Sequence, residues 1–222
     1  MGKGFPMRRL ALLAALLLLA SCGSETESID DVSIAKRIIS QKTTGKAGAA
    51  AAPAITRELL DSIGKPLLRA KVENTGAVAV LGLIGQNGNA VTWTSADAIS
   101  LTLRDGIVVA TRGLGDDLIS AAVPALAAVY QGQGLEQRRL YSLEGGDTEV
   151  MRPYDCSLSV KGTESLVLYG IGYTVRHVVE ACRGPAGTFQ NDYWMEVGGK
   201  MRQSRQWIGE QVGFLELQLV SR

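Results

Sequence analysis

The sequence predicts a mainly β protein, an antiparallel β-sandwich or open barrel with a few short helices near the N-terminus and after residue 115. Three observations support this expectation. From Pro66 onward, short runs rich in β-branched residues follow one another, which is typical of strands. Turn signals such as NTG, QNGN and RDG separate the runs at short intervals, which favours antiparallel pairing over βαβ units. The chain also holds 26 glycines and only 5% aromatic residues, as turn-rich β proteins do.

The clearest strand pair lies in the segment ISLTLRDGIVVAT. Ile99, Leu101 and Leu103 alternate with polar residues, so one face of this strand is expected to point into a core. Asp105-Gly106 is a favoured two-residue hairpin turn. The segment 164–183 is long enough for one bent strand or two. The expected strand regions are 67–74, 77–86, 90–96, 98–104, 106–113, 135–144, 148–162, 164–184, 188–199, 200–211 and 213–222.

Helical spacing of apolar residues appears in three places. Segments 30–41 and 55–63 each place isoleucines and leucines on one face, and Gly64 is a stop signal for the second. A low-complexity linker, 42–54, separates them, although its alanines leave a longer helix open. In GLGDDLISAAVPALAAV, the residues Leu118, Ile119, Ala122 and Val123 predict a short helix that Pro124 interrupts.

The first residues have the features of a secretory signal. Basic residues precede a short apolar run from Leu10 to Ala20, which is too short to span a bilayer. The run ends in Leu19-Ala20-Ser21-Cys22, which resembles the bacterial lipobox. We therefore expect a cleaved signal peptide at 1–21, a lipid on Cys22, a tether with short helices at 22–65 and a β-rich domain at 66–222; a plain secreted protein is the alternative. Gly23, rather than Asp, after the lipidated Cys favours the outer membrane, facing the periplasm.

Removal of the signal changes the charge and the cysteine count. Loss of three basic residues turns the formal net charge from +1 to −2, which gives no electrostatic case for nucleic acid as a partner. Cys156 and Cys182 remain, an even pair in an oxidising compartment, so a disulfide worth roughly 3 kcal/mol is expected, with two buried thiols as the alternative. A single histidine, His177, leaves too few ligands for a metal site, and nothing indicates a cofactor.

No catalytic constellation assembles from the sequence. His177 lies in an expected strand, where a structural role is favoured. Asp116 and Asp117 are either paired carboxylates of the glycosidase kind or, as we favour, caps of the helix expected after them. Glycine-containing segments such as EGGD and EVGGK are expected to be turns rather than phosphate loops.

The aromatic residues offer a different kind of site. Trp93, Trp194 and Trp207, together with Tyr193, are candidates for stacking on sugar or for a partner surface, with plain core packing as the alternative. The basic residues Lys200, Arg202 and Arg205 are expected on a solvated strand face, with contact to a charged glycan or a lipid headgroup as the alternative.

Two segments resemble one family. TWTSADAISLTLRDGIVVATRGLGDDLISA is similar to the central signature of the YjbF/GfcB family of group 4 capsule polysaccharide lipoproteins, and NDYWMEVGGKMRQSRQWIGEQVGFLELQLV is similar to its closing region. With the lipobox, the likeness covers most of residues 66–220, and 42–54 resembles an insertion. The positions that match the family pattern are Trp93, Ser95, Thr111, Gly113, Leu114, Asp117, Trp194, Ser204 and Gln206.

The resemblance implies an outer-membrane lipoprotein that serves capsule or exopolysaccharide production or export without being an enzyme. It implies that the protein works beside an outer-membrane β-barrel protein and a periplasmic protein of the same operon. It also implies that the protein contacts the glycan, the β-barrel protein or both. Trp93, Asp117, Trp194 and Trp207 are the candidate contact residues. Two alternatives stay open: a periplasmic glycan-modifying enzyme that uses Asp116 or Asp117, and a structural envelope lipoprotein.

Overall fold

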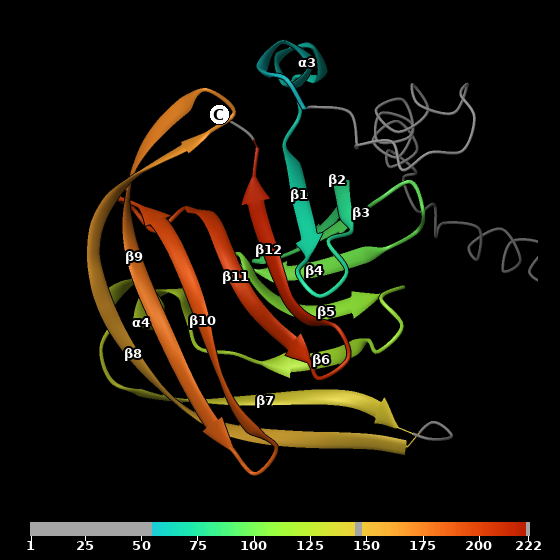
Figure 1. Ribbon diagram of the computed structural model, residues 1–222, viewed down its shortest axis with the longest axis vertical. Helices are drawn as coiled ribbons and strands as arrows, with labels where there is room; N and C mark the ends of the chain where they lie inside the picture. The colour runs from blue at the N-terminus through green and yellow to red at the C-terminus, as the bar shows by residue number, and fades with distance from the viewer. Residues whose placement is uncertain (1–54, 145–147, 221–222) are drawn as a thin grey trace, which may run out of the picture.

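The structure is a computed structural model that describes residues 55–144 and 148–220. These residues form two short helices and twelve strands in one antiparallel sheet (Figure 1). The helices are α3 (Arg57–Ile63) and α4 (Leu126–Gln131). The strands are β1 (Leu67–Val72), β2 (Val78–Asn87), β3 (Ala90–Thr94), β4 (Ser100–Arg104), β5 (Ile107–Arg112), β6 (Leu118–Ala122), β7 (Leu135–Glu144), β8 (Thr148–Leu168), β9 (Ile171–Gly184), β10 (Gly187–Glu196), β11 (Met201–Gly209) and β12 (Gly213–Leu219).

The sheet curls into a nearly closed barrel, as expected from the sequence. Its strand order is β5-β4-β3-β2-β1-β12-β11-β10-β9-β8-β7-β6, so each pair of adjacent strands is also consecutive in sequence, except β1 with β12. The two edges, β5 and β6, contact each other through the short turn that joins them. One of the contacts there is a side-chain bond, in which the Arg112 guanidinium donates to the Leu118 carbonyl. A mainly β, antiparallel barrel is therefore confirmed.

The strand directions define two ends of the barrel. We call the end that holds α3, the start of β1 and the finish of β12 the α3 end; the β2–β3, β4–β5 and β10–β11 turns lie there too. The opposite end holds the β1–β2, β5–β6 and β11–β12 turns. The helix α3 packs on the barrel through Leu60, which lies against Leu67, Val80 and Val220.

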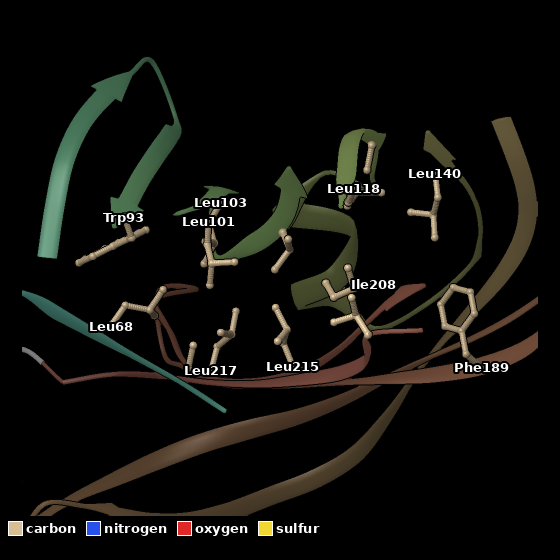
Figure 2. Packing of buried hydrophobic residues seen from close by; sticks show 14 of the residues in the cluster. Leu68, Trp93, Leu101, Leu103, Leu118, Leu140, Phe189, Ile208, Leu215 and Leu217 are labelled. Carbon is tan, nitrogen blue, oxygen red and sulfur yellow. The ribbon is translucent and has the colours of Figure 1, made fainter. Parts of the chain in front are cut away.

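The core fills the space between the barrel walls, which face each other across a layer of apolar side chains (Figure 2). Alternate residues along each strand point inward, so Leu215 and Leu217 of β12 face Leu101 and Leu103 of β4. A second cluster surrounds α4, whose Val129 is fully buried against Val178 and Tyr193.

The expected hairpin and the expected N-terminal helix are both present. Asp105 and Gly106 connect β4 to β5 with φ of 51° and 89°, the two left-handed conformations that a tight hairpin turn requires. The Thr56 hydroxyl accepts a hydrogen bond from the Leu59 amide at the start of α3, and Gly64 ends the helix with φ of 66°.

The helix predicted around Leu118 to Val123 is wrong. Residues Leu118–Ala122 form β6, and the helix of this region, α4, begins only after Pro124. The register of β6 shifts between Leu118 and Ser120, a β-bulge that turns both Leu118 and Ala121 inward. The apolar spacing of Leu118, Ile119, Ala122 and Val123 resembles that of a helix, but in β6 the bulge buries Ala121 and leaves Ala122 exposed.

The long segment 164–183 contains parts of two strands rather than one. The strand β8 runs without interruption from Thr148 to Leu168 and turns through Tyr169 and Gly170 into β9. The expected helix at 30–41, the linker at 42–54 and Cys22 lie outside the described residues. Within 55–144 and 148–220, neither helix has the length and apolar character needed to cross a bilayer.

Candidate functional site

A cavity of about 590 Å³ lies inside the barrel at the α3 end. Its size falls within the roughly 300–1,000 Å³ that is usual for small-molecule sites. Most of its lining is apolar and comes from strands on both walls and from the start of α4; the apolar residues are Leu68, Val91, Trp93, Leu103, Leu126, Met201, Leu217 and Leu219. Sequence reasoning singled out only Trp93 among them, because the others come together only when the barrel closes.

Polar groups gather at the rim of this cavity. Gln86 and Asn89 of the β2–β3 hairpin are exposed there, and the Asn89 amide donates to the Asp105 carboxylate at 2.6 Å. Lys200, in the β10–β11 turn, is exposed on the other side of the rim. Its pKa is lowered from the ordinary lysine value, first by partial burial and then by the positive charge of Arg202. An anion at this rim would lessen that penalty.

The structure separates the four candidate contact residues. Trp93 is 6% exposed and lines the cavity at the α3 end. Asp117 and Trp207 line a second cavity at the opposite end. Trp194 lies on neither cavity; it pairs with His177 across β9 and β10. The four residues therefore do not form one contact surface.

Asp117 stabilises the turn between β5 and β6 rather than a helix. Its carboxylate accepts hydrogen bonds from the Thr111 hydroxyl at 2.8 Å, the Gly113 amide at 2.8 Å and the Leu114 amide at 3.1 Å. The Thr111 hydroxyl in turn accepts from the Leu118 amide at 2.9 Å. The prediction of a helix cap is wrong because β6, and not a helix, follows this turn.

The second cavity, of about 310 Å³, is more polar than the first. Asp116, Glu144, Glu210 and Arg152 contribute charged side chains to its wall. Arg152 forms an ion pair with Glu144. The ring of Trp207 packs between Phe189, at a centroid distance of 5.9 Å, and Phe214, at 5.0 Å, so it extends the core at this end.

His177 contacts two carboxylates and an indole ring. Its Nε2 lies 2.8 Å from an Asp192 carboxylate oxygen, and its Nδ1 lies 3.3 Å from a Glu164 carboxylate oxygen. The imidazole stacks on the Trp194 ring at a centroid distance of 4.5 Å, and the Trp194 indole N–H donates to Glu164. Glu164 comes from β8, so this cluster joins β8, β9 and β10.

The basic residues Lys200, Arg202 and Arg205 do not form a solvated face. Only Lys200 is exposed. Arg202 is 5% exposed, donates to Glu196 at 2.6 Å and lies over the Tyr173 ring at 4.2 Å. Arg205 donates to both carboxylate oxygens of Glu73, at 2.7 Å and 2.8 Å. The prediction is wrong for Arg202, which is buried beside Glu196 and Tyr173, whereas Arg205 is half-buried and pairs with Glu73 of the β1–β2 turn.

Sequence reasoning missed a buried polar network inside the barrel. Arg138 of β7 donates to both carboxylate oxygens of Glu180 on β9, at 3.2 Å and 2.8 Å, and both residues are at most 1% exposed. Tyr193 and Asn191 of β10 also donate to Glu180, at 2.6 Å and 2.7 Å. Charged residues in strands usually face solvent, so no local signal marks this pair.

The network fixes the ionisation of its members. Burial opposes the charge on Glu180, but the charge of Arg138 and the three donors outweigh it, so the pKa of Glu180 lies below its ordinary value. Burial and the Glu180 carboxylate raise the pKa of Tyr193 well above its ordinary value. Next to Glu180, Cys156 and Cys182 lie directly opposite each other on β8 and β9 and are joined by the expected disulfide.

Three further residues of the resemblance hold walls and turns of the barrel. The Gln206 side chain of β11 accepts from the Val108 amide at 2.9 Å and donates to the Gly106 carbonyl at 2.9 Å, so it fastens the β4–β5 hairpin to the opposite wall. Ser204 accepts a second hydrogen bond from the Gln206 amide at 2.8 Å. The Ser95 hydroxyl accepts from the Ile99 amide and holds the β3–β4 turn.

Comparisons with known proteins agree with this architecture. The solved structure of the hypothetical lipoprotein YmcC from Escherichia coli (K12) is similar, with a TM-score of 0.64 at 19% identity, over 71% of this chain and 87% of that one. At this identity the likeness concerns the fold. No curated protein matches the chain. The family model described as group 4 capsule polysaccharide lipoprotein gfcB, YjbF matches residues 33–220. Because this match spans most of the chain, the protein belongs to the YjbF family of group 4 capsule polysaccharide lipoproteins.

Proposed function

We propose that the protein is a lipid-anchored, non-enzymatic accessory of capsule or exopolysaccharide production or export. The observation that carries the proposal is the family match over residues 33–220, because that family is described as a capsule polysaccharide lipoprotein. The segment Leu19–Cys22 supports lipidation at Cys22, and Gly23 supports the outer membrane with the barrel in the periplasm. We propose that its partners are an outer-membrane β-barrel protein and a periplasmic protein of the same operon. It binds the barrel protein, the glycan, or both of these.

The environment of Asp117 supports a role without catalysis. A glycosidase needs one carboxyl group to deliver a proton and a second to act as base or nucleophile. The Asp117 carboxylate already accepts three hydrogen bonds from its own turn. Its oxygens are therefore occupied in holding the β5–β6 connection, which favours a structural role for the residue.

Crosslinking in intact outer membranes tests the proposal. The tagged full-length protein is crosslinked in living cells, purified, and its partners are identified by mass spectrometry. We expect an outer-membrane β-barrel protein from the polysaccharide export genes, the glycan itself, or both. The control is an unrelated outer-membrane lipoprotein with the same tag and anchor, and recovery of the same set of partners with this control would refute specific binding.

The alternative function, a glycan-modifying enzyme, is favoured by one observation, the polar cavity at the end of the barrel opposite α3. Asp116, Glu144 and Glu210 bring three carboxylates to its wall. To distinguish the two functions, the purified protein is incubated with the exported polysaccharide. The chain length and the substituents of the polysaccharide are then measured. We expect no turnover, whereas turnover that Asp116→Asn abolishes while the fold persists would establish the enzyme.

A further inference from the structure

We propose that the cavity at the α3 end binds the hydrocarbon chain of a membrane amphiphile, with the polar head of the amphiphile at the rim. The inference deepens the proposed function, since it rests on the protein being anchored at a membrane, but it does not require the polysaccharide role. The ligand class follows from the lining, the rim and the position of the cavity, which are taken in turn.

The lining of the cavity matches a hydrocarbon chain. Leu103 on one wall and Leu217 on the other face the same space, and Trp93 lies deeper along β3 than the hairpin at the mouth. Removal of a methylene chain from water into such a lining is favourable in proportion to the area buried. A sugar would have to bury several hydroxyl groups against a lining that is mostly apolar, where few polar side chains could pair with them, which is costly.

The rim of the cavity matches a polar head. Asn89, Asp105 and Lys200 are placed at the turns around the mouth and Gln86 near the end of β2, while Arg202, Gln203 and Ser204 add polar groups along β11. An apolar interior below a ring of polar and charged groups is the arrangement that an amphiphile needs, because its head stays hydrated while its chain is buried. Lys200, whose positive charge is disfavoured by burial and by Arg202, gives an anionic or zwitterionic head a favourable contact.

The mouth of the cavity lies at the end of the barrel where the described chain begins. The chain enters the barrel at α3, after the 32 residues that separate Cys22 from Ile55, and α3 is at the same end as the mouth. Val197, next to the rim glycine Gly198, is 89% exposed, so an apolar side chain projects beside the opening. Exposed apolar residues at the edge of a cavity are a feature of surfaces that meet lipid or a partner.

Photo-crosslinking in living cells tests this inference on the whole protein. A benzophenone amino acid replaces Leu219, which lines the cavity, or Gln218, its neighbour on β12, whose amide instead donates to Gln203. Cells are irradiated before any detergent is added, and the purified protein is analysed by peptide mass spectrometry. We expect adducts that contain a hydrocarbon chain at position 219 and little or none at position 218.

The mass of the adduct identifies the source of the chain. A free phospholipid or fatty acid, a lipid-linked glycan and the protein's own acylated Cys22 peptide differ in mass, and each of them would place a hydrocarbon chain in the cavity and support the inference. A second probe pair, Leu126 in the lining and Ala127 exposed beside it on α4, covers the case in which the Leu219 variant does not fold.

A pair of tryptophan variants, one inside the cavity and one outside it, tests whether the cavity itself holds the chain. Leu103→Trp adds volume inside, while Arg104→Trp adds the same side chain at an exposed neighbouring position. Excluding about two methylenes from the cavity weakens binding roughly tenfold, so we expect a corresponding loss of adduct for Leu103→Trp only. Equal adduct yields at positions 218 and 219, adducts without a hydrocarbon chain, or no effect of Leu103→Trp would overturn the inference. None of these outcomes bears on whether polysaccharide export needs the protein, which is measured separately.

Discussion

Side chains of the YjbF pattern act mainly by holding turns and walls of the barrel. Asp117 and Thr111 organise the β5–β6 turn, Ser95 organises the β3–β4 turn, and Gln206 joins β11 to the β4–β5 hairpin. Gly113 adopts φ of 86°, which favours glycine within the turn that Asp117 binds. These residues therefore maintain the shape of the barrel.

Replacement of Asp117 tests its role in the turn. Asp117→Ala leaves the Thr111 hydroxyl and two turn amides without their acceptor, so we expect the free energy of unfolding to fall by about 1–3 kcal/mol. Denaturant unfolding followed by circular dichroism measures the change. Asp116→Ala is the neighbouring control, for which a change within about 0.5 kcal/mol is expected. Equal effects of the two variants would contradict the assignment.

Gln206 gives a second test at the level of a single residue. Gln206→Leu keeps the size of the side chain but leaves the Val108 amide and the Gly106 carbonyl without this partner, and we expect a loss of about 2 kcal/mol. Gln203→Leu, three positions earlier on β11, removes only a bond to Gln218 and should cost less. Thermal unfolding of both variants provides the comparison, and a Gln206→Leu protein as stable as the parent would refute the role.

Local sequence could not reveal these long-range partners. Gln206 bonds to residues about one hundred positions earlier in the chain, and Arg138 pairs with Glu180 42 positions later. The Asp105-Gly106 turn, in contrast, was predictable because its hydrogen bonds and its backbone conformation are decided by adjacent residues.

Among the elements, prediction succeeded where the side-chain period was undisturbed. The regular alternation in β4 gave both the strand and its buried face, with Leu101 and Leu103 inside. In β6 a bulge altered the period, and the spacing of Leu118, Ile119, Ala122 and Val123 suggested a helix instead. A bulge depends on pairing with β7, which the sequence of β6 alone does not describe.

The β8–β9 hairpin is the element that the disulfide stabilises. Cys156 and Cys182 close a separation of 26 residues, so replacing both by Ala should lower the free energy of unfolding by about 3 kcal/mol. A reducing agent should lower the stability of the parent protein in the same way and leave the variant unchanged. If the reductant destabilises both proteins equally, the effect does not come from this bond.

The ion pair between β7 and β9 predicts a dependence of stability on pH. The pKa of Glu180 is lowered in the folded protein, so the unfolded chain binds its proton more readily, and the stabilisation is present above the unfolded glutamate pKa of about 4.3. We expect it to be lost as the pH falls from there through the folded pKa. Glu180→Gln removes this titration, and denaturant unfolding at several acidic pH values should show a flatter profile for the variant. Parallel profiles would contradict the prediction.

For the whole molecule, closure of the barrel creates features that no segment holds alone. The pairing of β1 with β12 joins the two ends of the β region and brings Leu68 and Leu217 to one cavity. The fold class followed from composition, alternation and turns, but the two cavities depend on which walls meet. This is why Trp93, Trp194 and Trp207 were grouped in the sequence and are separate in the structure.

The direct test of the account is the amount of polysaccharide at the cell surface. The gene is deleted in the parent bacterium and complemented with the wild type or with Cys22→Ser, and surface polysaccharide is quantified alongside the periplasmic pool. We predict that deletion lowers the surface polysaccharide, that the wild type restores it, and that Cys22→Ser, which cannot be lipidated, does not. Undiminished surface polysaccharide in the deletion strain would contradict the account and leave a structural envelope lipoprotein as the better description.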